Sequence, residues 1–303
     1  KPVSFEKNLL PLIIKECTFS YYRVLFKEYR WRLLFLEKYD GIREQIEVFH
    51  KYHPEVERFN WETLLNPFAN QSTLTHAEVY TYIEKLLLEA EKGPEESPLN
   101  AAFGTWRRIS QGFNEIYSFG GLDVASHKLF DRNYFGLFNR IAYGPPVKNM
   151  KKMLALAEAG IVDFGFVRGS TFEFDESSGA YGFLKGENLK EQALDYLINA
   201  RIPRNNESET PSPLYRSILE NGIGRKFLNS SGGTYTPGCM DMDARGRMIA
   251  KDGKVQEGIA LYGTPTEGLT LDNDTLSRKR NNLASQWAEE VAIAIELREP
   301  VNQ

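Results

Sequence analysis

Apolar residues in the first half of the chain recur at helical spacing. Between Phe5 and Tyr39 they fall three and four positions apart, at Leu9, Leu10, Ile13, Ile14, Cys17, Val24 and Leu25. The residues Thr75-His76-Ala77-Glu78 have the pattern of a capping box, in which each terminal side chain bonds the other's backbone. Residues 1–145 are therefore predicted to form a helical region, with further helices over 41–50, 76–92, 99–118 and 123–142.

After Gly144-Pro145-Pro146 the pattern changes to short apolar runs between helices. Apolar runs of this length are typical of strands covered on both faces of a sheet. The predicted fold class is α+β, a helical N-terminal half followed over residues 146–303 by a small sheet with flanking helices. Helices are expected at Asn149–Gly160, Pro211–Gly222 and Asn281–Leu297, a hairpin across Asp175–Gly179, and strands of one sheet at Ile161–Val167, Asp195–Ala200 and Gly258–Tyr262.

The strand that begins at Gly258 runs into a loop with glycine at both ends. Glycine lets a backbone approach a ligand closely, and a following helix N-terminus offers unpaired N–H groups. A tight turn that needs positive φ is the alternative explanation. A carboxylate at Glu267 would be favoured near a helix start. The candidate cofactor-binding residues are Gly263, Thr264, Pro265, Thr266, Glu267 and Gly268.

The order of these short motifs is more informative than any one of them. The segments Met153–Val162, Asp195–Ala200 and Gly258–Gly268 carry the likeness. Together the residues from Asn149 to Val291 resemble the C-terminal part of the FAD/NAD(P)-binding flavoprotein family, which is related to the two-dinucleotide-binding flavin oxidoreductases. The resemblance implies a fragment of an α/β flavoprotein, FAD as cofactor, NAD(P)H as reductant, and one wall of the flavin site at Gly263–Gly268.

The chain departs from that family in three places. Arg201 follows Ala200 where the family carries Thr-Gly, and Thr264 follows Gly263 where related enzymes place an aspartate against the ribityl chain. The Gly-x-Gly-x-x-Gly sequence that receives a pyrophosphate after a strand is absent from the chain. We therefore expect a C-terminal fragment whose partner is a missing N-terminal nucleotide-binding half. Alone it should bind FAD weakly or not at all.

Composition limits the partners. The net charge of −4 does not suit a nucleic-acid surface, which requires clustered positive charge. The sequence has no run of about 18 apolar residues, the length that a membrane span needs. With two cysteines and no Cys-x-x-Cys pair, a redox disulfide is not indicated and a cytoplasmic location fits best.

Other reactive side chains have ordinary structural explanations. His50 and His53 have the spacing of metal ligands, but Pro54 ends the helix and no second ligand cluster follows, so no metal is assigned. His127 is expected on a solvent-facing helix surface. Cys17 is expected to be buried, and Cys239 is the one candidate reactive thiol, with an inert thiol as the alternative. Asp241 and Asp243 are assigned to surface turns.

Two functions remain. The first is the C-terminal portion of an FAD- and NAD(P)H-dependent oxidoreductase or monooxygenase, in which the helical region supplies part of a small-molecule substrate pocket and the Gly258–Gly268 segment supplies one wall of the flavin site. The alternative is a non-catalytic helical interaction module or scaffold. Flavin content separates the two.

Overall fold

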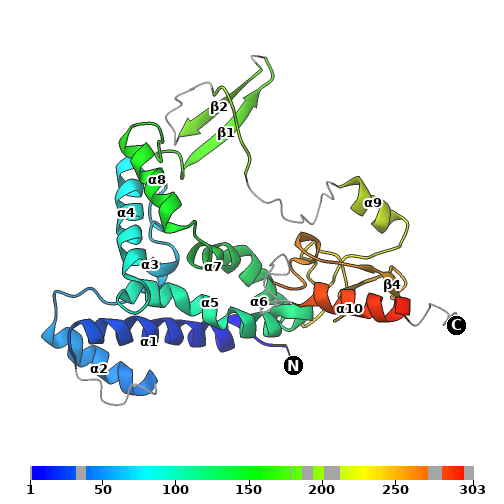
Figure 1. Ribbon diagram of the computed structural model, residues 1–303, viewed down its shortest axis with the longest axis horizontal. Helices are drawn as coiled ribbons and strands as arrows, with labels where there is room; N and C mark the ends of the chain where they lie inside the picture. The colour runs from blue at the N-terminus through cyan, green and yellow to red at the C-terminus, as the bar shows by residue number, and fades with distance from the viewer. Residues whose placement is uncertain are drawn as a thin grey trace. The chain divides into compact units, whose positions relative to one another are not determined.

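The computed structural model describes residues 2–31, 39–177, 179–185, 194–200, 212–271 and 282–296 (Figure 1). Their contacts form two compact units. Unit 1 comprises residues 1–11, 108–136 and 202–303, and unit 2 comprises residues 12–107 and 137–201. The division into regions 1–145 and 146–303 stays a prediction, because each unit draws on both ranges. None of the described helices is both long enough and apolar enough to cross a membrane.

Unit 2 is built around the aromatic face of its first helix. A π-helical turn at Phe5–Leu9 leads into α1 (Leu10–Glu28), which ends before Arg30 at positive φ and thus well short of the expected Tyr39. Helix α2 (Tyr39–Tyr52) packs against it, and α3 (Trp61–Leu65) follows. The shared core consists of Tyr22, Leu25, Phe26, Ile42, Ile46 and Phe49. The aromatic density of α1 is therefore core packing.

Helices α4 (His76–Lys92) and α8 (Val147–Glu158) lie side by side in unit 2 (Figure 1). The predicted capping box is present. The Glu78 backbone N–H donates to Thr75 Oγ1 at 3.3 Å, and the Thr75 N–H donates to Glu78 Oε2 at 2.8 Å. Val79, Leu154, Ala157, Leu74 and Phe164 form the buried cluster between the two helices.

The remaining helices correspond to the predicted ones. Helix α5 (Pro98–Tyr117) confirms the expected helix at 99–118. The expected helix at 123–142 contains α6 (Val124–Leu129), a π-helical turn at Phe130–Tyr134 and α7 (Phe135–Ala142). Helices α9 (Pro213–Glu220) and α10 (Leu283–Glu296) confirm the last two, although Pro211, Asn281 and Leu297 lie outside the described residues.

The α+β class is confirmed, but the prediction of a single sheet is wrong. Strands β1 (Ser170–Asp175) and β2 (Ala180–Lys185) form one antiparallel hairpin, which confirms the turn at Asp175–Gly179. Strands β3 (Arg247–Ile249) and β4 (Val255–Ala260) form a separate antiparallel pair. The expected strand at Gly258–Tyr262 is thus only the end of β4.

The other two expected strands are not strands in the structure. In residues 161–167 the Asp163 carboxylate accepts the Gly165 N–H at 2.7 Å, which turns the chain. Residues 195–200 belong to no strand, and the preceding Leu194 forms an isolated bridge to Tyr181. An apolar run becomes a strand only where another strand offers backbone partners. The described residues offer none to these two segments.

The capping box gives a local test. We expect Thr75→Ala to weaken the first turn of α4 by about 1 kcal/mol, because one N–H at the helix start loses its acceptor. Amide hydrogen exchange in residues 76–80 should accelerate about fivefold. Thr81→Ala, at an exposed interior position of the same helix, should not accelerate it. Equal exchange in both variants would show that the cap does not stabilise this turn.

Candidate functional site

The candidate loop, residues 263–268, follows β4 in unit 1 and is held in place by hydrogen bonds to neighbouring backbone. Residues Thr264–Thr266 form one 3₁₀ turn. The Pro265 carbonyl accepts the Met240 N–H at 2.8 Å, and Thr266, which is fully buried, donates its hydroxyl to the Gly263 carbonyl at 2.9 Å. A loop fixed by these bonds keeps its shape without a ligand.

The two glycines of the loop have different roles. Gly268 has φ +109, and a Cβ there would lie 2.5 Å from Pro237 Cβ, so a side chain cannot fit. It packs against the protein interior. Gly263 has φ +79 and ψ −150, a region open essentially to glycine alone, yet a Cβ there would meet no atom within 4 Å.

Gly263 therefore provides the open edge of the loop. Its backbone N–H donates no hydrogen bond within the described part of the chain. Thr264 and Glu267 flank it and are partly exposed. A donor beside open space fits the approach of a polar ligand such as the ribityl or phosphate part of a flavin. Cofactor contact at residues 263–268 stays a prediction.

A buried polar network lies behind the loop. His127 is fully buried, and its Nε2 lies 2.9 Å from the Tyr117 hydroxyl. Tyr117 and Tyr235 donate their hydroxyls to the two oxygens of Asp131, at 2.7 and 3.0 Å. Asn229 Nδ2 lies 3.0 Å from His127 Nδ1. These side chains connect α5, α6 and the π-helical turn at Phe130–Tyr134 to the segment 229–235 of the same unit.

The hydrogen-bond partners assign the His127 tautomer. An amide nitrogen can only donate, so Nδ1 accepts from Asn229 and the proton lies on Nε2. Burial lowers the pKa of His127 from 6.5 to about 4. The Asp131 carboxylate, 3.4 Å from Nε2, would favour the imidazolium, but it already accepts two phenol hydrogens. Burial dominates, so His127 is neutral near pH 7.

This network corrects the expected position of His127. The prediction of a solvent-facing surface was wrong, because His127 packs against the rings of Phe227 and Tyr235 and is fully buried. The sequence carried one usable signal, the i,i+4 pair of His127 and Asp131. Nothing in it indicated that Asn229 and Tyr235, about one hundred residues further on, would complete the network.

The other reactive groups are occupied or buried. Cys17 and Cys239 are both fully buried, and burial raises the pKa of the Cys239 thiol, which confirms the inert alternative. Asp241 is buried and ion-paired with Arg225 at 2.7 Å, so its assignment to a surface turn was wrong. Within the described residues, His, Cys, Asp and Glu nowhere gather into a group of three that could hold a metal.

A separate cavity of about 350 Å³ lies in unit 2, within the region predicted to serve the substrate. Helices α1, α3, α4 and α5 and the segment before α3 enclose it. Its lining combines apolar, acidic and basic side chains: Tyr21, Leu25, Glu28, Glu57, Arg58, Phe59, Asn60, Thr63, Leu64, Pro67, Tyr82, Lys85, Leu86, Glu89, Lys92, Pro98, Leu99 and Phe103. Pockets of this volume accommodate small ligands.

Comparison with known proteins gives relatives but no family model, since none matches the chain. A nitrosuccinic acid synthase of Aspergillus oryzae is 28% identical over 279 residues, which cover 88% of this chain and 42% of that protein. L-aspartate N-monooxygenases of Streptomyces davaonensis and Streptomyces cremeus are 27% and 26% identical, again over 88% of this chain and over 43% and 42% of their own lengths. The chain thus spans less than half the length of these relatives, and two of them are monooxygenases by name.

The buried His127 predicts a pH dependence of stability. The unfolded chain binds the imidazole proton at pH about 6.5, whereas the folded chain binds it only at about 4. The free energy of unfolding should therefore fall as the pH decreases from 6.5 to 4, by about 3 kcal/mol from this residue. Denaturant unfolding measured across that range tests this.

His127→Gln is the matched variant, because it removes the titrating group. Its pH dependence between 6.5 and 4 should be much shallower. His50, whose pKa burial also lowers, stays in both proteins and contributes with the same sign. Parallel curves for the two proteins would contradict the assignment of a neutral, buried His127.

Proposed function

We propose that the chain is the C-terminal portion of a flavin-dependent monooxygenase that oxidises the amine of a small molecule with NAD(P)H as reductant. The observation that carries the proposal is the similarity to the three relatives over 88% of the chain. A similarity of that extent includes residues of both compact units, so it is not confined to one local motif. The flavin and the nicotinamide come from the family resemblance of residues 149–291.

The loop at residues 263–268 is the proposed flavin wall. The Gly263 N–H would donate to a polar atom of the cofactor, and Thr264 and Glu267 would flank that contact. Pro265, Thr266 and Gly268 would keep the loop in place through their inward contacts. When bound, the flavin would supply the redox chemistry between nicotinamide and oxygen. The residues of this chain would orient it and exclude water.

The proposed partner is a nucleotide-binding half of the same protein. The chain has no glycine-rich phosphate motif, so most pyrophosphate contacts must come from elsewhere. Within residues 195–200, the side chains of Tyr196 and Ile198 are 87% and 86% exposed. Neighbouring exposed apolar side chains are typical of a surface that another part of a protein covers. The nucleotide-binding half would provide that cover.

Flavin content tests the proposal. We expect a protein that joins this chain to its nucleotide-binding half to purify with FAD and to consume NAD(P)H when an amine substrate is present. The 303-residue chain alone should purify without flavin absorbance. A colourless longer protein would favour the helical interaction module, and stoichiometric FAD on the chain alone would refute the division of the site.

Two glycine variants of the longer protein locate the flavin wall. Gly263→Val should lower the ratio of flavin to protein strongly, because the new side chain fills the open space beside the Gly263 N–H. Gly232→Val is a matched control, since Gly232 also has positive φ, +82, and open space at its Cβ position. Both variants should lose stability through backbone strain.

Only Gly263→Val should lose flavin beyond what its thermal midpoint explains. Measuring the absorbance ratio and the melting temperature on the same samples separates the two effects. His53→Ala should keep its flavin, because His53 lies directly after α2 in unit 2 and contacts the rings of Trp31 and Phe49. A Gly263→Val protein with full flavin occupancy would place the wall elsewhere.

A further inference from the structure

The cavity of unit 2 has an apolar wall on one side. The rings of Tyr21 and Phe59 lie 5.0 Å apart between centroids, tilted by 39°. Leu25 and Leu64 are buried beside them, and Phe103 also lines the cavity. A wall of this kind removes apolar surface of a ligand from water and presents ring faces that attract a cation.

Some charged side chains of the cavity lining form ion pairs within the protein, and others do not. Glu89 accepts from Lys92 at 2.8 Å and from the Ser97 hydroxyl at 2.6 Å. Arg58 is bound to both oxygens of Glu47. Among the described residues Glu28 and Glu57 make no hydrogen bond or ion pair. Within the described part of the chain, the cavity lining therefore has two carboxylates without an ion-pair partner, although Lys92 interacts electrostatically with Glu28.

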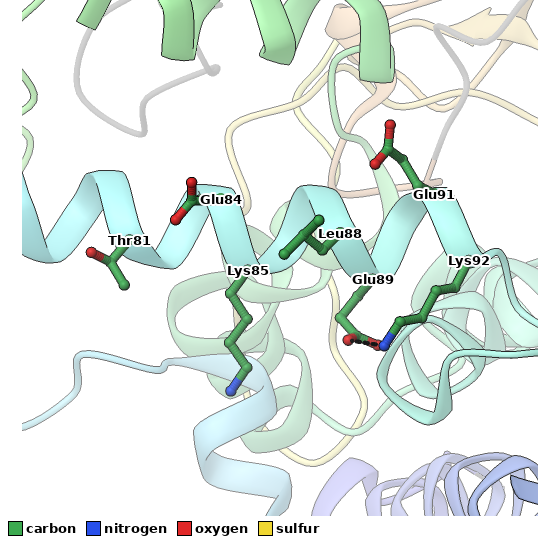
Figure 2. Close-up of a pocket in the computed structure, with 7 residues that line it drawn as sticks. All are labelled: Thr81, Glu84, Lys85, Leu88, Glu89, Glu91 and Lys92. Carbon is green, nitrogen blue, oxygen red and sulfur yellow. Dashed lines mark hydrogen bonds and ion pairs between the residues drawn. The ribbon is translucent and has the colours of Figure 1, made fainter. Parts of the chain in front are cut away.

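Helix α4 supplies the basic side of the cavity. Figure 2, a close-up of another pocket along α4, shows Lys85, Glu89 and Lys92 projecting from one side of the helix, with the Lys92–Glu89 ion pair drawn. Glu84 and Glu91 project from the other side. Lys85 is exposed and has no ion-pair partner among the described residues. Among the described residues, the cavity lining thus contains one basic and two acidic side chains without an ion-pair partner.

The Tyr21 hydroxyl is a further polar group of the cavity lining. Burial, the neighbouring Tyr22 and the carboxylates of Glu57, Glu89 and Glu28 raise the pKa of Tyr21 to about 12. The phenol stays protonated, and its oxygen can accept a hydrogen bond from a cation. Burial, the largest of these causes, opposes a charge of either sign, whereas the three carboxylates favour a positive charge near the phenol.

We propose that this cavity binds a primary ammonium group carried on an apolar body. Glu28 and Glu57 are the anionic partners, the Tyr21 oxygen accepts a hydrogen bond, and the Tyr21 and Phe59 rings cover the apolar part. As a substrate site this rests on the proposed function, because the amine is the group that would be oxidised. As a binding site it stands on the cavity alone.

The charge balance distinguishes this ligand from aspartate. Aspartate carries two carboxylates, which require two cations. Arg58 and Lys92 are already paired, so only Lys85 remains. The substrate of this chain would therefore be an apolar amine, in contrast to the amino acid that the names of two relatives specify.

Calorimetric titration of the 303-residue chain with 2-phenylethylamine tests the proposal. We expect saturable binding at one site that weakens as salt is raised. The anion 3-phenylpropionate, which keeps the ring, and L-aspartate, which keeps the amine, should each bind at least about tenfold more weakly, the equivalent of one lost charged contact. Equal affinity for 3-phenylpropionate, or tighter binding of aspartate, would overturn the assignment of the ligand.

Matched carboxamide variants locate the binding site. Glu57→Gln and Glu28→Gln should each raise the dissociation constant of 2-phenylethylamine about three- to tenfold, as expected for half-solvated charge pairs. Glu84→Gln on the opposite side of α4 should leave it within about twofold. Unchanged thermal midpoints show that the variants are folded, since all three side chains are exposed. Equal effects of all three would overturn the site.

Failure of the amine-binding proposal can be distinguished from failure of the proposed monooxygenase function. Amine binding by the chain, together with a colourless longer protein, would confirm the cavity and refute the monooxygenase. A flavin-containing longer protein whose chain does not bind the probe would refute the cavity alone.

Discussion

The hydrogen-bond network around His127 is the constraint on which unit 1 depends. Burying an imidazole, a carboxylate and two phenols is unfavourable unless each polar atom has a partner. Here each one does, because Asn229 donates to Nδ1 while Asp131 accepts from both tyrosines. Removing one member would leave another unsatisfied in a buried place. The network therefore fixes α5 and α6 against residues 229–235.

The loop at 263–268 is held in place by hydrogen bonds from the end of α5, the helix that carries Tyr117 of the network. Phe119 donates its N–H to the Leu269 carbonyl at 2.9 Å, and Asn114 exchanges hydrogen bonds with the backbone of Leu271. The loop is thus attached on its inner side to the end of α5. Only the Gly263 edge remains open, so a ligand would meet a preformed surface. Preformed donors lower the entropic cost of binding.

The two units differ in the chemistry they offer. Unit 1 presents the backbone N–H of Gly263, which donates no hydrogen bond within the described residues, and this suits a polar cofactor. Unit 2 contains a cavity of apolar and charged side chains, in which Glu28 and Glu57 have no ion-pair partner among the described residues, and this suits an amine. A monooxygenase that acts on nitrogen needs both kinds of site. The relatives are each more than twice as long as the part that this chain matches.

The sequence alone determined the helices, because their signals are local. The spacing around α1, the Thr75–Glu78 cap and the Pro213 helix start each depend on residues a few positions apart. It also determined the Asp175–Gly179 hairpin, whose strands adjoin in sequence. Strand pairing at 161–167 and 195–200 could not be read in this way, because an apolar run does not specify its partner. The tertiary structure alone decided that His127 is buried and that Gly268 faces inward while Gly263 faces outward, since those differences arise from contacts with residues up to about one hundred positions away.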